Sequence, residues 1–198
     1  MSGLPVIAVD DADALDRAEA ALRGGDAIVI PTDTVYGLAA RADDADAMAR
    51  LFELKGRDAA KSIAVLVSDL GQARTLTTHR LDRFAPFWPG PLTVVVPRAD
   101  GAQLHIGADD TTVGIRCPDD AFVRRLALEV GPIAATSANE SGSPTPATAR
   151  EIAALFPSVA LVVDGGPRRG LASTVVDATV DPPVVLRAGA LTPAALGL

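Results

Sequence analysis

The hydrophobic pattern of the chain alternates between helical spacing and short apolar runs, which predicts helices and strands in turn. Apolar residues at helical spacing, with Asp or Thr at the start and Gly after several of the ends, mark the helices. We predict helices at residues 11–23, 44–55, 120–130 and 148–156, with two short helical pieces between 67 and 87. Strands are predicted at 27–30, 63–67, 92–96, 112–116, 133–136, 161–163, 174–176 and 184–186.

This repeated alternation of helix and strand predicts an α/β fold in which helices flank a sheet. The last three predicted strands follow one another with little helix between them, so we expect hairpins and a mixed parallel and antiparallel sheet. A chain of 198 residues with 48% apolar content can bury a sizeable core. We therefore expect one domain covering residues 1–198.

The apolar runs are about five residues long, whereas a membrane-spanning helix needs about 20 apolar residues. The first residues, "MSGLPVIAVDDADA", have no basic region followed by a long apolar segment, which is the pattern of a signal peptide. The sequence therefore predicts a cytoplasmic protein with no membrane partner.

Charge and composition exclude several classes of function. The formal net charge of -7 disfavours general affinity for nucleic acid, which needs a basic face. Cys117 is the only cysteine, so neither an internal disulfide nor a Cys-based zinc site can form. His79 and His105 are isolated in the sequence and lack the spacing of metal ligands. The segment "GGPRRGLAS" at 165–173 looks like a phosphate-binding P-loop but lacks its Lys and its final Ser or Thr.

Candidate chemistry is concentrated in five polar segments that each begin or end a predicted strand. They are "PTDTVYG" at 31–37, "LKGRDAAKS" at 54–62, "SANESGSPTP" at 137–146, "GLAST" at 170–174 and "RAG" at 187–189. Ligands of open α/β sheets gather where strands end, so we expect these segments to meet at one cleft.

The residue types in these segments suit a nucleoside triphosphate. Lys55, Arg57 and Lys61 can neutralise a polyphosphate, and Ser137 and Asn139 lie in a small-residue loop that can form an anion-binding nest. The alternative for the three cations is a solvated helix end, where the helix dipole favours Lys and Arg. Arg116 ends an otherwise apolar strand, and its guanidinium suits a carboxylate.

Six motifs in order resemble the YrdC/Sua5 family of L-threonylcarbamoyladenylate synthases, from about Val6 to Gly189. The motifs are "PTDTVYGL", "KGR" followed by Lys61, "FWPGPLTVVV", "TSANESGSPTP", "STVVD" and "LRAG". The resemblance implies a twisted mixed sheet flanked by helices, with a concave basic cleft. It also implies a nucleotidyltransferase that joins L-threonine, bicarbonate and ATP into threonylcarbamoyl-AMP and pyrophosphate, for the t6A modification at position 37 of tRNA.

The resemblance implies roles for individual residues where the motifs align. The family's catalytic and ATP-binding signature matches Lys55, Arg57, Lys61, Ser137 and Asn139. Further ATP-binding positions match Thr112, Thr145 and Arg187, and the threonine-binding positions match Thr34, Arg116 and Ser173. Mg²⁺ is expected to accompany ATP, held mainly by the phosphates and not by side chains. The implied order is carbamate formation from threonine and bicarbonate, followed by attack of the carbamate on the α-phosphate.

Two positions depart from the family pattern. Asp58 stands where many relatives have Pro, and Leu66 stands near the position of a His that approaches threonine in longer relatives. The resemblance further implies that the threonylcarbamoyl transferase complex accepts the product, with at most a weak contact to tRNA. Two alternatives remain open: an RNA-binding or ribosome-maturation module of the same fold, and an enzyme that transfers a carbamoyl group to a different acceptor.

Overall fold

The elements predicted from the sequence occur in the expected order along the chain, together with two strands that were not predicted. The structure is a computed structural model that describes residues 6–56, 62–140 and 142–198. Its strands are β1 Val6–Ala8, β2 Ile28–Ile30, β3 Gly37–Arg41, β4 Ala64–Leu66, β5 Leu92–Pro97, β6 Thr112–Arg116, β7 Ile133–Ser137, β8 Leu161–Asp164, β9 Thr174–Asp177 and β10 Val184–Arg187. Its α-helices are α1 Ala14–Arg23, α2 Ala45–Lys55, α3 Leu70–Leu76, α4 Ala121–Val130 and α5 Ala149–Leu155, with 3-10 turns at Ala85–Phe87 and Ala194–Leu196.

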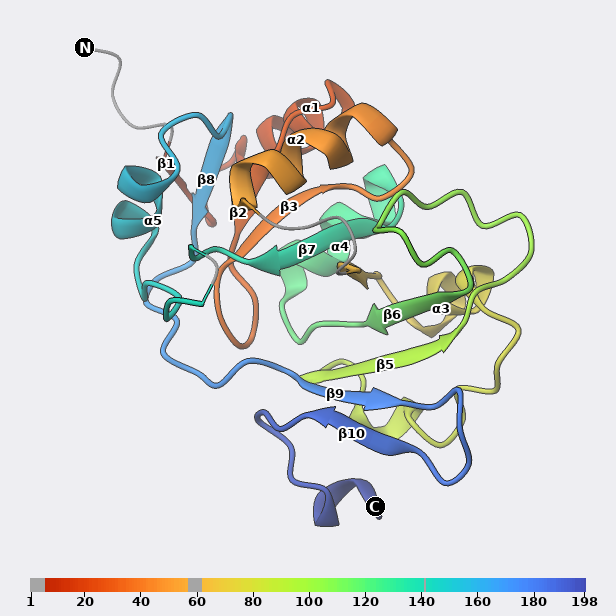
Figure 1. Cartoon of the computed structure of the whole chain (residues 1–198). Coiled ribbons are helices and arrows are strands. Elements are labelled where there is room, and N and C mark those ends of the chain that lie inside the picture. The colour runs from red at the N-terminus through yellow and green to blue at the C-terminus, as the bar shows by residue number, and fades with distance from the viewer. Residues whose placement is uncertain (1–5, 57–61, 141) are drawn as a thin grey trace.

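The described strands form one mixed sheet in the order β1-β8-β2-β3-β7-β4-β6-β5-β9-β10. Figure 1 shows this sheet, with most of its strands labelled. Strand β8 pairs in parallel with β1 and β2, and β4 pairs in parallel with β6. Strands β3 and β7 are antiparallel to both of their neighbours. The mixed sheet expected from the sequence is confirmed.

Side chains at the helix starts explain where the helices begin. Asp44, Asp69 and Asp120 each accept a hydrogen bond from a backbone N–H in the first turn of α2, α3 and α4. Thr148 and Glu151 form a capping box at the start of α5. Such caps satisfy backbone donors that have no partner within the helix. The predicted helix boundaries at these positions are accordingly close to the observed ones.

The sheet has an apolar layer on each face because its central strands alternate. Ile28 and Ile30 of β2 pack in one cluster with residues of α1 and α4, such as Leu22 and Leu126. Val29 points the other way, into a larger cluster that includes residues of α2, α3 and α5. No helix among the described residues is long and apolar enough to cross a membrane.

Two strands are not predicted by the local sequence pattern, and one predicted hairpin is wrong. Strand β3 has the sequence "GLAAR", whose Gly and Ala residues have low strand propensity; it is a strand because β2 and β7 bond both of its edges. The short β1 was also missed. Strands β9 and β10 form the expected hairpin, but β8 lies between β1 and β2 and does not pair with β9.

Candidate active site

A cavity of about 330 Å³ lies on the sheet face that carries α1 and α4, beyond the part that these helices cover. Residues that pair across neighbouring strands point to the same face of a sheet. Leu66 belongs to the apolar cluster under α1 and α4, and it pairs with the cavity residue Arg116, so the cavity lies on that face. The floor consists of alternate residues of neighbouring strands, and many of them are small. These floor residues include Gly37, Ala64, Thr93, Val95, Gly114 and Ala135.

Gly114 leaves room in the cavity floor. A methyl group at this position would lie 3.5 Å from Thr93 and 3.8 Å from Val95, which is ordinary contact. The glycine is therefore not needed to avoid a clash with the backbone. Because it has no side chain, it leaves the space above the strand open to a ligand.

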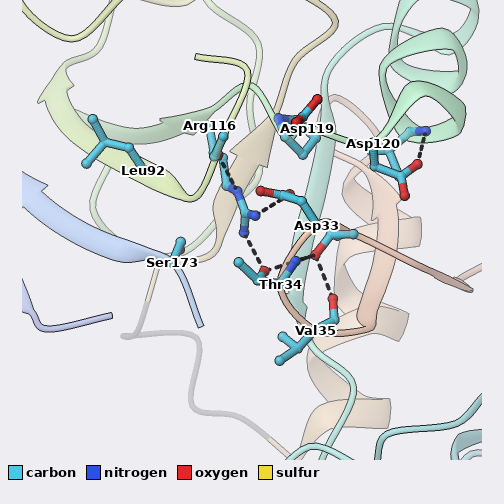
Figure 2. Close-up of polar contacts among 12 residues, drawn as sticks. Asp33, Thr34, Val35, Leu92, Arg116, Asp119, Asp120 and Ser173 are labelled. Atoms are coloured by element: carbon cyan, nitrogen blue, oxygen red, sulfur yellow. Dashed lines mark hydrogen bonds and ion pairs between the residues drawn. The ribbon is translucent and has the colours of Figure 1, made fainter. Parts of the chain in front are cut away.

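Arg116 is a buried cation at one end of this floor. Its Nη2 lies 2.5 Å from Oδ1 of Asp33, and its Nη1 donates to the hydroxyl of Thr34 at 3.0 Å, as Figure 2 shows. Its Nε donates to the carbonyl of Gly90 at 3.2 Å. Burial lowers the pKa of the guanidinium and Asp33 opposes that shift, so the arginine stays charged. These contacts use three of its five N–H donors.

The segment that carries Asp33 and Thr34 is fixed by its own hydroxyls and by a distant arginine. The Thr32 hydroxyl donates to the carbonyl of Val35 at 2.7 Å and accepts from the backbone N–H of Thr34 at 3.2 Å. Arg168, in the loop between β8 and β9, donates to the carbonyl of Thr32 at 2.7 Å. The segment "GGPRRGLAS", which has no P-loop signature, therefore helps to hold the wall of the cavity.

Three polar side chains meet at the β5/β9 side of the cavity. The hydroxyls of Thr93 and Ser173 lie 2.9 Å apart, and both residues are buried. Arg187 donates to the hydroxyl of Ser173 at 3.0 Å and to its carbonyl at 2.8 Å. Ser173 thus joins strand β5 to the cation on β10.

Lys55 lies beneath the loop after β7. It is only 6% exposed, and its Nζ contacts the carbonyl of Ser137 at 2.6 Å, the carbonyl of Asn139 at 2.5 Å and the amide oxygen of Asn139 at 2.7 Å. The amide nitrogen of Asn139 in turn donates to the carbonyls of Glu140 and Ser143. The solvated helix end considered as an alternative is therefore wrong for Lys55.

Thr112 marks the opposite end of strand β6 from Arg116. Its hydroxyl donates to Asp109 at 2.5 Å, and Asp109 also accepts from the hydroxyl and the backbone N–H of Thr111. These hydrogen bonds lower the pKa of Asp109 to about 2. Asp109 is therefore a carboxylate at neutral pH, and the proton of the Thr112 hydroxyl points toward it.

The structure brings most of the predicted site residues to this cavity. The predicted residues in its lining are Thr34, Thr112, Arg116, Ser137, Ser173 and Arg187. Lys55 and Asn139 lie under one wall and are not in the lining, and neither is the half-buried Thr145. Arg57 and Lys61 lie outside the described residues, so the basic character of the cleft stays a prediction.

Three residues of this site were not singled out from the sequence: Asp33, Thr93 and Asp109. Asp33 and Thr93 lie within motifs that were noted, "PTDTVYGL" and "FWPGPLTVVV", but nothing in the local pattern shows which neighbour each would contact. Their partners are 83 and 80 positions away in the sequence. Leu66, at one position that departs from the family pattern, lines the cavity with an apolar side chain.

No group of three or more His, Cys, Asp or Glu side chains that could hold a metal ion occurs among the described residues. Asp33, the carboxylate that contacts Arg116, is already paired with it. The single cysteine, Cys117, is buried, and burial raises the pKa of its thiol to about 11, so it is a neutral thiol at physiological pH.

The chain is similar to known proteins over most of its length. The sequence model of the Sua5/YciO/YrdC family, described as "Telomere recombination", matches residues 20–189. The chain is 40% identical over 184 residues to the threonylcarbamoyl-AMP synthase of Bacillus subtilis, which covers 89% of this chain and 53% of that protein.

Two solved structures are similar over most of the chain. The crystal structure of P. abyssi Sua5 complexed with L-threonine has a TM-score of 0.85 at 36% identity and covers 94% of this chain and 58% of that one. E. coli YciO has a TM-score of 0.85 at 26% identity and covers 94% of this chain and 95% of that one. The chain spans little more than half the length of the Bacillus and P. abyssi proteins.

Proposed function

The chain belongs to the Sua5/YciO/YrdC family, and on that premise we propose that it is a threonylcarbamoyl-AMP synthase. The proposed reaction joins L-threonine, bicarbonate and ATP and releases pyrophosphate. Curated relatives with this name, including the Bacillus subtilis protein, support the proposal. So does the threonine complex of P. abyssi Sua5, a chain that is 36% identical to this one.

The observation that carries the proposal is the buried fork of Arg116. Two of its five N–H donors have no acceptor among the residues that the structure describes, and the residue lines the cavity. A buried guanidinium with two open donors suits a carboxylate, which accepts two parallel hydrogen bonds. We assign these donors to the carboxylate of the amino-acid substrate. Thr34 and Ser173 then border its side chain.

The chemistry proceeds in two steps in this proposal. The α-amine of threonine first adds to the carbon of bicarbonate, and loss of water leaves a carbamate. A carbamate oxygen then attacks the α-phosphorus of ATP, an O–P bond forms, and the bond to the β-phosphate oxygen breaks to release pyrophosphate. The protein contributes position and positive charge, since neither step needs a covalent enzyme intermediate.

ATP is proposed to lie between the loop at 137–139 and the strand ends that carry Thr112 and Arg187. Lys55 supports this loop, because its ammonium group contacts three loop oxygens. Its charge would also act on the phosphates at short range in a site with little water. Arg57, Lys61 and Thr145 keep their proposed ATP-binding roles from the family motifs. Mg²⁺ enters as part of the substrate, bound by the phosphates.

Leu66 changes one expected contact. Its side chain lines the cavity but has no hydrogen-bonding group, so the contact made by a His near this position in longer relatives has no counterpart here. Threonine would then be held by Arg116 at one end of the cavity and by the hydroxyl groups that line it. We further propose that the product passes to a threonylcarbamoyl transferase complex in the cytoplasm, with at most a weak contact to tRNA.

The direct experiment measures pyrophosphate release from ATP with purified protein. Release should require both L-threonine and bicarbonate, and Arg116→Leu should abolish this threonine-dependent release. The two alternatives give different results: an RNA-binding module would show no such release, and an enzyme with another carbamoyl acceptor would show release that does not depend on threonine.

A further inference from the structure

The hydroxyls of Thr93 and Ser173 form a pair whose unused hydrogen-bonding capacity can be counted. Ser173 Oγ accepts one hydrogen bond from Arg187, and the two hydroxyls share one hydrogen bond with each other at 2.9 Å. Each hydroxyl has one proton and two lone pairs. Whichever of the two is the donor, the pair keeps one O–H proton and two lone pairs for a ligand.

The open proton and lone pairs of the two hydroxyls match the hydrogen bonds that a ligand hydroxyl can make. A ligand hydroxyl both donates and accepts one hydrogen bond, so it can satisfy the open proton and use an open lone pair. A methyl group in the same place can do neither, and it would leave a buried donor without a partner, which is costly. Both residues are about 95% buried and line the cavity, with Thr93 4% and Ser173 5% exposed.

Thr93 also lies beside the proposed carboxylate site. In the antiparallel pair of β5 and β6, Val94 pairs with Ile115 and Val95 with Gly114. The next pair in this register is Thr93 with Arg116, on the cavity face. Residues opposite each other in such a pair have Cβ atoms about 5 Å apart. Ser173, Thr34 and Arg116, which Figure 2 labels, all line this cavity.

From these three observations we infer that Thr93 is a specificity-determining residue: together with Ser173 it recognises the side-chain hydroxyl of an amino acid whose carboxylate is bound by Arg116. The inference rests on the proposed function and deepens it. It assigns the selection of threonine over valine, which differs only by a methyl in place of the hydroxyl, to the hydroxyl of Thr93 on strand β5 and that of Ser173, the residue just before β9.

The test compares kcat/KM for pyrophosphate release with L-threonine and with L-valine. A site built around a hydroxyl rejects the analogue that lacks it by about 10⁴-fold, whereas an apolar pocket gives only about 10²-fold. Thr93→Val keeps the shape and removes the hydroxyl, so we expect the threonine-to-valine ratio to fall by about 10- to 100-fold, through loss of threonine activity. Thr93→Ser restores a hydroxyl and should keep the ratio within about threefold of the wild-type value.

Two further variants separate recognition from stability. Thr77 is another buried threonine, bonded to the carbonyl of Pro97 and absent from the cavity lining, so Thr77→Val controls for the loss of a buried hydroxyl. It should leave the ratio unchanged. Ser173→Ala should lower the ratio, and adding Thr93→Val to it should cost less than the two single effects combined, because the hydroxyls act as one unit.

The outcomes distinguish this inference from the proposed function. If wild-type protein shows no threonine-dependent release, the proposed function fails and the inference fails with it. If the wild type is active and selective but Thr93→Val keeps the ratio, or lowers activity equally with both amino acids, only the inference is overturned. Should Thr93→Val not fold, an unchanged ratio in Ser173→Ala overturns it in the same way.

Discussion

Replacing Asp33 with alanine would leave the guanidinium of Arg116 buried without its counter-charge. The side chains of Arg116 and Asp33 are 7% and 13% exposed, and the ion pair spans 2.5 Å. Removing one partner of a buried pair costs about 3–5 kcal/mol. Because Arg116 keeps its bonds to Thr34 and Gly90, we expect the lower end, a loss of about 3 kcal/mol in the free energy of unfolding. For a chain of this size that is a fall in Tm of about 6–12 °C.

Urea and thermal unfolding followed by circular dichroism measure this loss. Asp33→Asn keeps an oxygen that can accept from Arg116 and removes only the charge, so its loss should be about half as large. Asp82→Ala is a matched control, since Asp82 pairs with Arg80 at 3.1 Å but both side chains are well exposed. Exposed pairs contribute less than about 1 kcal/mol, so this variant should stay close to the wild type.

Ligand addition tests the same reasoning at the site. A bound substrate carboxylate would supply the counter-charge that Asp33→Ala lacks, so saturating L-threonine should raise the Tm of this variant more than that of the wild type. L-threoninamide, which has no carboxylate, should not. If Asp33→Ala is as stable as Asp82→Ala, the pair does not stabilise the cavity wall. If threonine and threoninamide act alike, Arg116 does not bind the carboxylate.

Three further predictions follow from the cavity and its margins. Gly114→Leu should fold, because a Cβ here meets its neighbours only at ordinary contact distances and the residue lines the cavity. It should lower pyrophosphate release at least about 100-fold by filling the cavity, with Gly114→Ala intermediate, and equal activity of both variants would contradict the assignment of the floor. Lys55→Met should speed amide exchange in residues 137–140 but not in 121–130, as measured by mass spectrometry. The pKa of Asp109 is lowered from 3.8 to about 2 in the folded protein. The stability that Asp109 contributes is therefore fully present above pH 3.8 and is lost as the pH falls through about 2. The urea midpoints of the wild type and Asp109→Asn should accordingly converge from about pH 5 to about pH 2.

Local pattern was sufficient to predict the elements whose identity depends on their own residues. Strand β6 was predicted with its observed bounds, Thr112–Arg116, because its apolar and β-branched residues are bounded by turn-forming segments. Helices α2 and α4 were predicted within a residue of their observed ends, because Asp44 and Asp120 cap them. Strand β3 was missed because its residues favour no strand, and only the neighbouring edges make it one.

The site also has features that depend on local sequence and features that depend on distant neighbours. Six residues that line the cavity, such as Arg116 and Ser173, could be predicted from the motifs at the strand ends, whereas Thr93 was not singled out. The contacts that these residues make could not be predicted, since Arg116 reaches Asp33 and Thr93 reaches Ser173 only after the described strands have been placed in one order. A sequence motif specifies which groups are present; the sheet order specifies which of them share a hydrogen bond.

The contacts of Lys55 in the structure differ from the phosphate contact that its sequence motif suggests. From the sequence it is one cation among three near a polyphosphate, and any of them could donate to a phosphate oxygen. In the structure its three N–H donors meet three loop oxygens from Ser137 and Asn139. A direct phosphate contact would have to replace one of those bonds, whereas the charge acts without replacing any. Lys55 therefore both shapes the loop after β7 and raises the potential where phosphate is proposed to bind, and one substitution there would change both properties together.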